Sequence, residues 1–328
     1  MSDTNIVRYR RIIVESKTRD LDELLNKRAI DRRGFLKFCG LMATTLALGK
    51  SQVGRIALAL TTQPRPPVIW LEFQDCTGDT ESFLRISNPS LDDLILNQIS
   101  IDYHETLMTP AGDMAETSLL STMQAFNGQY IVVVEGSIPT ANNGIYCMIR
   151  GQTALSILQS VTAGAWGVVA AGSCAWDGGL AAAYPNPTGA VGVKDAVPGL
   201  TNLVNLPGCP TNAVNLAAVL VHVLTYNTLP ARDGENRPTA MYERKIHNDC
   251  ERRVHYEADR YVRAGGDEGN LKGWCLEKMG CKGPETKNNC AVVKWNDGTS
   301  FPIRSGHPCV GCARPHFWDQ STPFYKED

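Results

Sequence analysis

The chain has 328 residues, of which 43% are hydrophobic and 20% are charged, and its formal net charge is −2. This length and apolar content are enough for a sizeable core and for two domains. A nearly neutral chain has no bulk electrostatic attraction to nucleic acid or to an anionic membrane surface. Eleven cysteines in so long a chain exclude a small disulfide scaffold, although disulfides stay open if the protein is exported.

Residues 1–59 have the order of a targeting segment. The pair Arg32-Arg33 precedes an apolar run over residues 35–48, and Ala57-Leu58-Ala59 forms an A-x-A site. This order predicts a twin-arginine signal peptide that is cleaved after Ala59. The apolar run is shorter than the roughly 20 residues of a membrane-spanning helix. An ordinary amphipathic N-terminal helix is the alternative.

The export route bears on the cysteines. The twin-arginine route carries folded proteins, as a cofactor inserted in the cytoplasm requires, whereas a disulfide protein has no need of it. The signal therefore favours bound metal and predicts a location in the periplasm or at the outer face of the cytoplasmic membrane. Attachment there would be peripheral, through another protein, because residues 322–328 are polar. Cys39 would leave with the signal peptide.

Residues 60–230 carry a βαβ pattern. Short apolar runs without clean alternation are typical of strands buried on both faces of a parallel sheet, and they occur here at residues 68–73, 129–135, 165–171 and 202–206. Helical stretches are predicted over residues 151–163 and 212–226. The pattern predicts a flavodoxin-like, doubly wound α/β domain. Residues 231–328 are polar and loop-rich, and predict a smaller domain held partly by bound metal.

Three cysteines come directly after predicted strands. Cys76 follows the first strand, Cys174 follows the third and Cys209 follows the last. Because parallel strands end at the same edge of a sheet, these side chains should converge. Asp79 occupies the second position of a C-x2-C-like clip, where carboxylate is an unusual but feasible iron ligand. The alternatives are that Asp79 caps the next helix or that Asp75 ligates instead.

Seven more potential ligands lie within residues 247–312. A soft-metal core needs thiolates, with an occasional imidazole, that converge from separate turns. Seven ligands are too many for one tetrahedral ion and suit two iron–sulfur clusters, one bound by four ligands and one by three. They are His247, Cys250, Cys275, Cys281, Cys290, Cys309 and Cys312.

The spacing of these ligands leaves the metal open. The first four could hold a [4Fe–4S] cluster or zinc, although structural zinc usually draws on two close pairs. The last three suit a [3Fe–4S] core, which needs no fourth protein ligand. A [4Fe–4S] cluster completed by His307 is the alternative, but this residue precedes Pro308 and is expected in a turn. Cys147 is left over and is expected to be a buried hydrophobic residue.

Taken together, the motifs resemble the small subunit of a [NiFe] hydrogenase over residues 66–325. No single motif is specific, but the combination is. The motifs that carry the resemblance lie at residues 76–78, 144–147, 172–174, 186–190, 207–210, 281–284 and 306–312.

The resemblance implies three clusters in a row. It assigns a proximal [4Fe–4S] cluster, a medial [3Fe–4S] cluster with Pro302 in place of a fourth ligand, and a distal [4Fe–4S] cluster. Their implied ligands are, in that order, Cys76, Asp79, Cys174 and Cys209; then Cys290, Cys309 and Cys312; then His247, Cys250, Cys275 and Cys281.

The resemblance also implies partners and a division of labour. Hydrogen would be split at a nickel–iron site in a separate, obligate large subunit, and this chain would hold no catalytic residue. It would pass electrons between that site and a membrane cytochrome or another acceptor. The expected assembly is a heterodimer, which could pair further as a dimer of heterodimers. Asp75 could assist proton movement at the interface, or be an ordinary surface carboxylate.

Asp79 is the main departure from the family pattern, because most members carry cysteine there and some carry aspartate. The oxygen-tolerant membrane-bound type adds two cysteines, at the positions held here by Gly78 and Gly179, so that cluster type is not expected.

Two other interpretations of the chain's function stay open. One is the iron–sulfur subunit of a quinone oxidoreductase complex, and the other is an exported zinc or disulfide structural protein.

Overall fold

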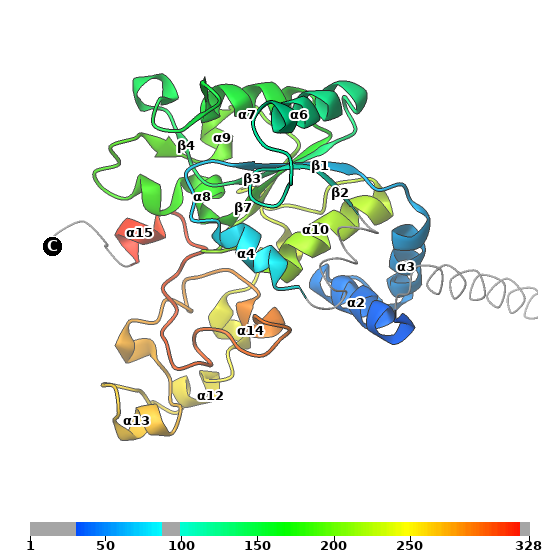
Figure 1. The fold of residues 1–328 in the computed structure, drawn as a ribbon. Coiled ribbons are helices and arrows are strands. Elements are labelled where there is room, and N and C mark those ends of the chain that lie inside the picture. Colours follow the sequence, from blue (N-terminus) through cyan, green and yellow to red (C-terminus); the bar gives the residue numbers. More distant parts are fainter. Residues whose placement is uncertain (1–30, 87–98, 322–328) are drawn as a thin grey trace, which may run out of the picture.

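The structure is a computed structural model that describes residues 31–86 and 99–321. It consists of an α/β domain and a smaller, loop-rich C-terminal domain beside it (Figure 1). Within the described residues, no helix combines the length and the apolar character needed to cross a membrane.

A five-stranded parallel sheet in the order β2-β1-β3-β7-β9 forms the centre of the α/β domain. This doubly wound, flavodoxin-like order confirms the predicted fold class. Every residue of β1, β3, β7 and β9 is buried, as predicted for runs that lack alternation. The strands are β1 (Pro67–Glu72), β2 (Ser100–His104), β3 (Ile131–Glu135), β7 (Gly167–Ala171) and β9 (Leu203–Leu206).

Helices cover both faces of the sheet (Figure 1). The first face packs on α7 (Ala154–Ala163), and α6 (Asp113–Ala125) lies on the same side. The second face packs on α10 (Ala213–Tyr226). Successive strand residues point to opposite faces, so Trp70 belongs to the α10 core and Leu71 to the α7 core.

The expected elements differ from the observed ones in two ways. The edge strand β2 and helix α6 were not predicted, because β2 is only partly buried and α6 buries only two side chains. Helix α7 begins three residues later than expected. Thr153 is its N-cap, accepting from the Ser156 N–H, and ends a short hairpin of β5 (Met148–Ile149) and β6 (Gln152–Thr153).

The described part of the predicted targeting segment contains two α-helices. Helices α2 (Arg32–Thr45) and α3 (Val53–Thr62) pack on each other and on α10. Each buries one side, and this leaves open both the signal peptide and the amphipathic-helix alternative. Residues 1–30 of the segment lie outside the described residues, and cleavage after Ala59 stays a prediction.

Short elements complete the α/β domain and carry its loops. They are α4 (Gly78–Leu84), β4 (Ile138–Pro139), α8 (Gly172–Asp177), β8 (Ala190–Val191) and α9 (Val193–Ala196).

The C-terminal domain has little regular structure and a small apolar cluster. Two of the seven buried members of that cluster, Cys290 and Cys309, are themselves predicted ligands. The helices near and within this domain have four residues each: α11 (Thr239–Tyr242), α12 (Arg253–Tyr256), α13 (Glu268–Leu271), α14 (Cys290–Val293) and α15 (Phe317–Gln320).

Candidate metal centres

The proximal site lies at the carboxyl edge of the sheet. Strands β1, β7 and β9 are parallel, so the residues that follow them meet at this edge. Burial, followed by the nearby charges of Cys209, Asp79 and Cys76, raises the pKa of the Cys174 thiol. The structure therefore brings these four predicted ligands within electrostatic reach of one another.

Asp79 does not cap the helix in which it lies. The N-cap of α4 is Thr77, in the left-handed conformation, and the Asp79 side chain is buried within the first turn. Its Oδ1 accepts a hydrogen bond of 2.5 Å from the N–H of Thr211, just beyond Cys209. A Cβ at Gly172 would lie 2.1 Å from Asp79 Oδ2, so the glycine provides the space for the carboxyl group.

The surroundings of Asp79 disfavour its ionised form. Burial, and next the charge of Glu135, raise the pKa of Asp79 to about 8. A buried carboxyl group beside another acid and three thiols suits a site for a positively charged metal centre, because the cation offsets the penalty of ionisation. The donor set of three thiols and one carboxyl therefore fits an iron–sulfur cluster chemically.

Glu135 positions Asp79, and it is not among the site residues predicted from the sequence. Its side chain is fully buried at the end of β3. Oε1 accepts from the Asp79 N–H at 2.9 Å, and Oε2 accepts from the Thr80 hydroxyl at 2.5 Å and from Trp70 Nε1 at 3.1 Å. These bonds hold the first turn of α4 against the sheet. A single acid that ends an apolar strand was the signal that could have identified it.

Asp75, the competing ligand, is held in its own loop. Its Oδ1 accepts from the Thr77 N–H at 2.9 Å, and its Oδ2 is buried without a hydrogen-bond partner. Burial raises the pKa of Asp75 to about 6. This carboxyl group lies beside the proximal site, but one of its two oxygens is hydrogen-bonded to the backbone of its own loop.

Gly78 and Gly179 lie directly against proximal thiols. A Cβ at Gly78 would be 2.9 Å from Cys76 Sγ, and one at Gly179 would be 2.4 Å from Cys174 Sγ. Gly179 also has a φ of +54°, which favours glycine. A side chain at either position would therefore require the site to shift.

The three predicted medial ligands also converge. Burial, followed by the charges of Cys312 and Cys309, raises the pKa of the Cys290 thiol. Cys309 Sγ accepts from the N–H of Gly311 at 3.4 Å. Hydrogen bonds from backbone N–H groups to cysteine sulfur are a known influence on iron–sulfur potentials.

The remaining candidates near the medial site behave as loop residues. His307 is exposed, and its Nδ1 lies 2.7 Å from the carbonyl oxygen of Pro308, as expected for a turn residue. Pro302 is exposed between the buried side chains of Phe301 and Ile303.

The four predicted distal ligands line one pocket, and they are His247, Cys250, Cys275 and Cys281. Cys281 Sγ accepts from the Gly283 N–H at 3.5 Å. The His247 ring packs edge-on against Tyr256, with centroids 4.6 Å apart, and the Tyr256 side chain is 40% exposed. The distal pocket thus approaches the surface through an aromatic contact.

Two hydrogen bonds connect the medial cysteines with the other two candidate sites. Ser173, next to Cys174, donates through its hydroxyl to the carbonyl oxygen of Cys312 at 2.5 Å. Lys282, next to Cys281, donates its backbone N–H to the carbonyl oxygen of Cys309 at 2.8 Å. The medial cysteines are therefore bonded to the neighbours of a proximal and of a distal ligand, and they lie between the two.

None of the eleven cysteines forms a disulfide. Cys147 is half-buried rather than fully buried, and packs against the α7 core. Cys39 is fully buried in α2. In the described residues, no three His, Cys, Asp or Glu side chains are arranged to hold a single metal ion.

Two protein families match successive parts of the chain. Residues 76–223 match the family described as the NADH ubiquinone oxidoreductase 20 Kd subunit. Residues 242–325 match the family that describes the C-terminal part of NiFe/NiFeSe hydrogenase small subunits. The first match agrees with the α/β cluster domain shared with quinone-linked complexes, and the second is specific to hydrogenases.

Relatives match along nearly the whole chain. The periplasmic [NiFe] hydrogenase small subunit 1 of Nitratidesulfovibrio vulgaris is 46% identical over 93% of this chain and 96% of its own length. The hydrogenase-2 small chain of Escherichia coli K12 is 44% identical over 88% of this chain and 78% of its own length. The Ni-Fe-Se hydrogenase of Desulfomicrobium baculatum, solved in a reduced, active form, is 32% identical with a TM-score of 0.73, and the match covers 81% of this chain and 100% of that one.

The fold and the ordered cysteine sites define an electron-transfer subunit of an oxidoreductase complex. The chain belongs to the family of [NiFe] hydrogenase small subunits. Such subunits carry iron–sulfur clusters and pair with a large subunit in which the hydrogen chemistry takes place. The quinone-linked and structural-protein interpretations are thereby set aside.

Proposed function

We propose that this chain relays single electrons between a large-subunit nickel–iron site and an external acceptor through three iron–sulfur clusters. The observation that carries the proposal is that the medial cysteines accept hydrogen bonds from both other sites. Cys312 accepts from Ser173, next to a proximal ligand, and Cys309 accepts from Lys282, next to a distal ligand. Bound clusters supply one-electron redox chemistry. The proximal and distal sites would each hold a [4Fe–4S] cluster, and the three medial thiols a [3Fe–4S] cluster.

The chain's own residues position and tune the sites. The backbone N–H groups of Gly283 and Gly311 point at ligand sulfurs, which stabilises the thiolate form. Glu135 fixes the turn that carries Asp79. Burial of Cys290 and Cys309 excludes water from the middle of the relay.

The large subunit would cover the proximal edge. Large apolar side chains are exposed in the segments that follow β3 and α8, namely Ile145, Tyr146, Met148, Leu180 and Tyr184. Leu180 follows Gly179, which contacts Cys174. Exposed large apolar side chains are expected where an obligate partner covers the surface. The exit would lie at His247 and Tyr256, where a membrane cytochrome or another acceptor could bind.

Export by the twin-arginine route is part of the proposal. The solved relative is matched over all of its length by only 81% of this chain, and residues 1–59 are about 18% of it. Removal of a leader of this length would produce such a difference. The mature protein would then be periplasmic or peripheral to the outer face of the cytoplasmic membrane.

Cluster analysis of the purified heterodimer tests the relay. Two [4Fe–4S] clusters and one [3Fe–4S] cluster should give about eleven iron atoms and about twelve acid-labile sulfides per heterodimer, beyond the iron of the nickel–iron site. Cys209→Ser, Cys312→Ser and Cys281→Ser should each alter a different cluster signal in electron paramagnetic resonance. Cys147→Ser is the matched control and should alter none. Material without acid-labile sulfide would refute the proposal.

The carboxylate at position 79 should change the proximal potential. Carboxylate is a harder donor than thiolate, and Asp79 lies within reach of Glu135. We therefore expect Asp79→Cys to shift the proximal potential while leaving the medial and distal potentials in place, and to alter the response to oxygen. Redox titration of both proteins measures this, and identical proximal potentials would remove the idea.

A further inference from the structure

Helix α10 is covered on two sides. Its sequence is apolar on nearly all faces, which is typical of a helix that is buried all round. The sheet covers one side, and α2 and α3 cover the other as part of the same apolar core. The described part of the predicted leader, helices α2 and α3, therefore occupies a surface of the folded domain (Figure 1).

Specific contacts hold the two leader helices in place. The Tyr226 hydroxyl, at the end of α10, donates to Gln52 Oε1 at 3.0 Å. The Arg55 guanidinium lies over the Tyr226 ring, 4.5 Å from its centroid. Phe38 of α2 is buried and lines the same cavity as Ala217 of α10.

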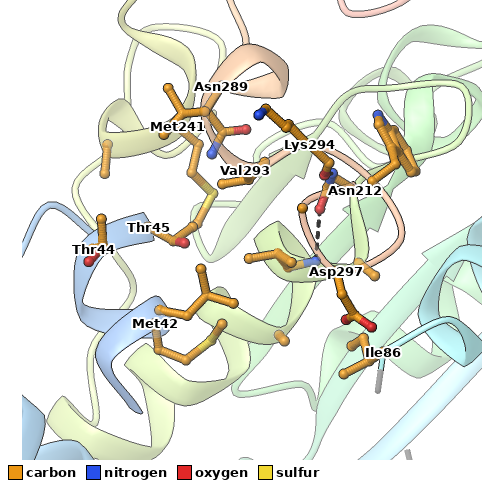
Figure 2. Close-up of a pocket in the computed structure, with 18 of the residues that line it drawn as sticks. Met42, Thr44, Thr45, Ile86, Asn212, Met241, Asn289, Val293, Lys294 and Asp297 are labelled. Atoms are coloured by element: carbon orange, nitrogen blue, oxygen red, sulfur yellow. Dashed lines mark hydrogen bonds between the residues drawn. The ribbon is translucent and has the colours of Figure 1, made fainter. Parts of the chain in front are cut away.

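That cavity has a volume of about 680 Å³ and depends on the leader for one wall. Figure 2 shows Met42 and Thr45 of α2 on one side of it, with Met241 and Val293 across from them. The wall opposite α2 thus includes α11 and α14, which lie close to the medial site. The leader contacts a surface that both domains build.

The predicted cleavage site is inaccessible in this arrangement. Ala57, Ala59 and Leu60 are 1%, 7% and 3% exposed, and all three lie inside α3. A peptidase can cut only a chain that has opened locally, so the rate of cutting depends on how often α3 opens. In contrast, Arg32 and Arg33 are exposed at the start of α2, which Asp31 caps.

We propose that the leader binds its own folded domain before export, with α10 as the receptor surface. This proposal rests on the proposed export of the chain. Binding keeps the twin arginines readable while it protects the Ala59–Leu60 bond and covers the apolar side of α10. Processing then follows only after α2 and α3 leave α10. The occupant of this surface before cleavage is the chain's own segment 32–62.

The test uses the full-length chain, bound to its large subunit and purified from cells that lack the translocase. The heterodimer is incubated with purified signal peptidase, and the appearance of an N-terminus at Leu60 is timed. Substitutions are placed on the receptor so that the leader sequence is unchanged. Ala217→Asp puts a charge on α10 at the cavity that Phe38 also lines, and Tyr226→Ala removes the contacts to Gln52 and Arg55. Leu120→Asp, exposed on α6 at the other face of the sheet, is the matched control.

We expect slow cleavage in the wild type and in the control, and cleavage faster by on the order of tenfold or more in Ala217→Asp, with a smaller increase in Tyr226→Ala. Hydrogen exchange should show protection of residues 53–62 in the wild type and loss of it in both receptor variants. The visible absorbance of the clusters verifies that each variant is folded. If Ala217→Asp does not fold, Tyr226→Ala decides alone.

Two results separate the failure of this inference from the failure of the proposed export. Equal cleavage rates in wild type, receptor variants and urea-unfolded chain would overturn leader binding while export stands. If even the unfolded chain is not cut after Ala59, the proposed signal peptide is wrong. Exchange protection of α3 in the heterodimer would then still report whether the segment is bound to α10.

Discussion

The two domains of this chain are stabilised in different ways. The α/β domain has two large apolar cores, one on each face of a parallel sheet, and the residues of its strands are nearly all buried. The C-terminal domain has one small cluster that includes two predicted ligands among its seven buried members. We therefore expect burial of apolar surface to be sufficient for the first domain, and bound metal to contribute to the stability of the second.

This difference explains how each site is built. The proximal ligands follow strands whose positions the sheet fixes, so that site would be largely formed before iron binds. The distal ligands come from separate loops around one pocket. A site of this second kind contributes folding free energy when the metal binds.

Removal of iron should have the largest effect on stability, and it should affect the C-terminal domain but not the sheet. With anaerobic chelation we expect amides of residues 243–312 to lose most of their exchange protection, while those of β1, β3 and β7 retain it. Hydrogen exchange with mass spectrometry measures both regions in one sample, and reconstitution with iron and sulfide is the control. Equal loss in both domains would show that the sheet also depends on the clusters.

Truncation of a core side chain should destabilise the α/β domain more than the C-terminal domain, which is the opposite of the effect expected from iron removal. Leu71→Ala removes a side chain that is 1% exposed in β1, and should lower the free energy of unfolding by about 2–5 kcal/mol. Ile303→Ala, at 3% exposure in the C-terminal cluster, should have a smaller effect while the clusters are bound. Urea unfolding of the loaded protein compares them. Leu120→Ala, on the exposed side of α6, is the control, with a change of at most about 0.5 kcal/mol.

Asp177 links the two domains and should make stability depend on pH. Its carboxyl group accepts from the His316 N–H at 2.9 Å, and burial raises the pKa of Asp177 to about 7. Because the folded protein keeps this proton longer than the unfolded chain, the contribution is present at pH 4 and is lost as the pH rises to about 7.

The expected change across that interval is roughly 1–3 kcal/mol, after allowance for relaxation around a partly exposed group. Asp177→Asn should flatten it. Thermal unfolding of both proteins at pH 4, 5.5 and 7 makes the comparison. A parallel pH dependence in the variant would assign the effect to other groups.

Exposed ion pairs should matter least. Several join neighbouring side chains in the C-terminal domain, but the Lys272–Glu268 pair is 60% and 67% exposed. Such a pair contributes at most about 0.5 kcal/mol, so Lys272→Ala should leave the urea midpoint nearly unchanged. A large loss would mean that charge networks, and not bound metal, hold this domain.

The sequence was most informative where burial is uniform. The bounds of the strands that precede Cys76, Cys174 and Cys209 agree with the predicted ones within one or two residues, because strands buried on both faces are continuous apolar runs. Strand β2 and helix α6 are not predicted, because they bury too few side chains to create an apolar pattern in the sequence. The candidate ligands were all identifiable from residue type.

Tertiary structure supplied what residue type cannot. Glu135 is an ordinary acid in the sequence and becomes the group that positions Asp79 only because β3 ends opposite α4. The proximity of the three candidate sites appears only in hydrogen bonds from Ser173 and Lys282 to Cys312 and Cys309, farther along the chain. The apolar run of the predicted leader looked detachable, yet it packs on α10.

The sequence by itself determined the fold class, the family and the identities of the candidate ligands, because apolar runs and soft donor atoms are properties of residues. Only the tertiary structure showed that the four distal candidates line one pocket, that hydrogen bonds connect the medial cysteines to both other candidate sites, and what the N-terminal helices cover. Those depend on contacts between segments that are distant in the chain, and local sequence does not encode such distances.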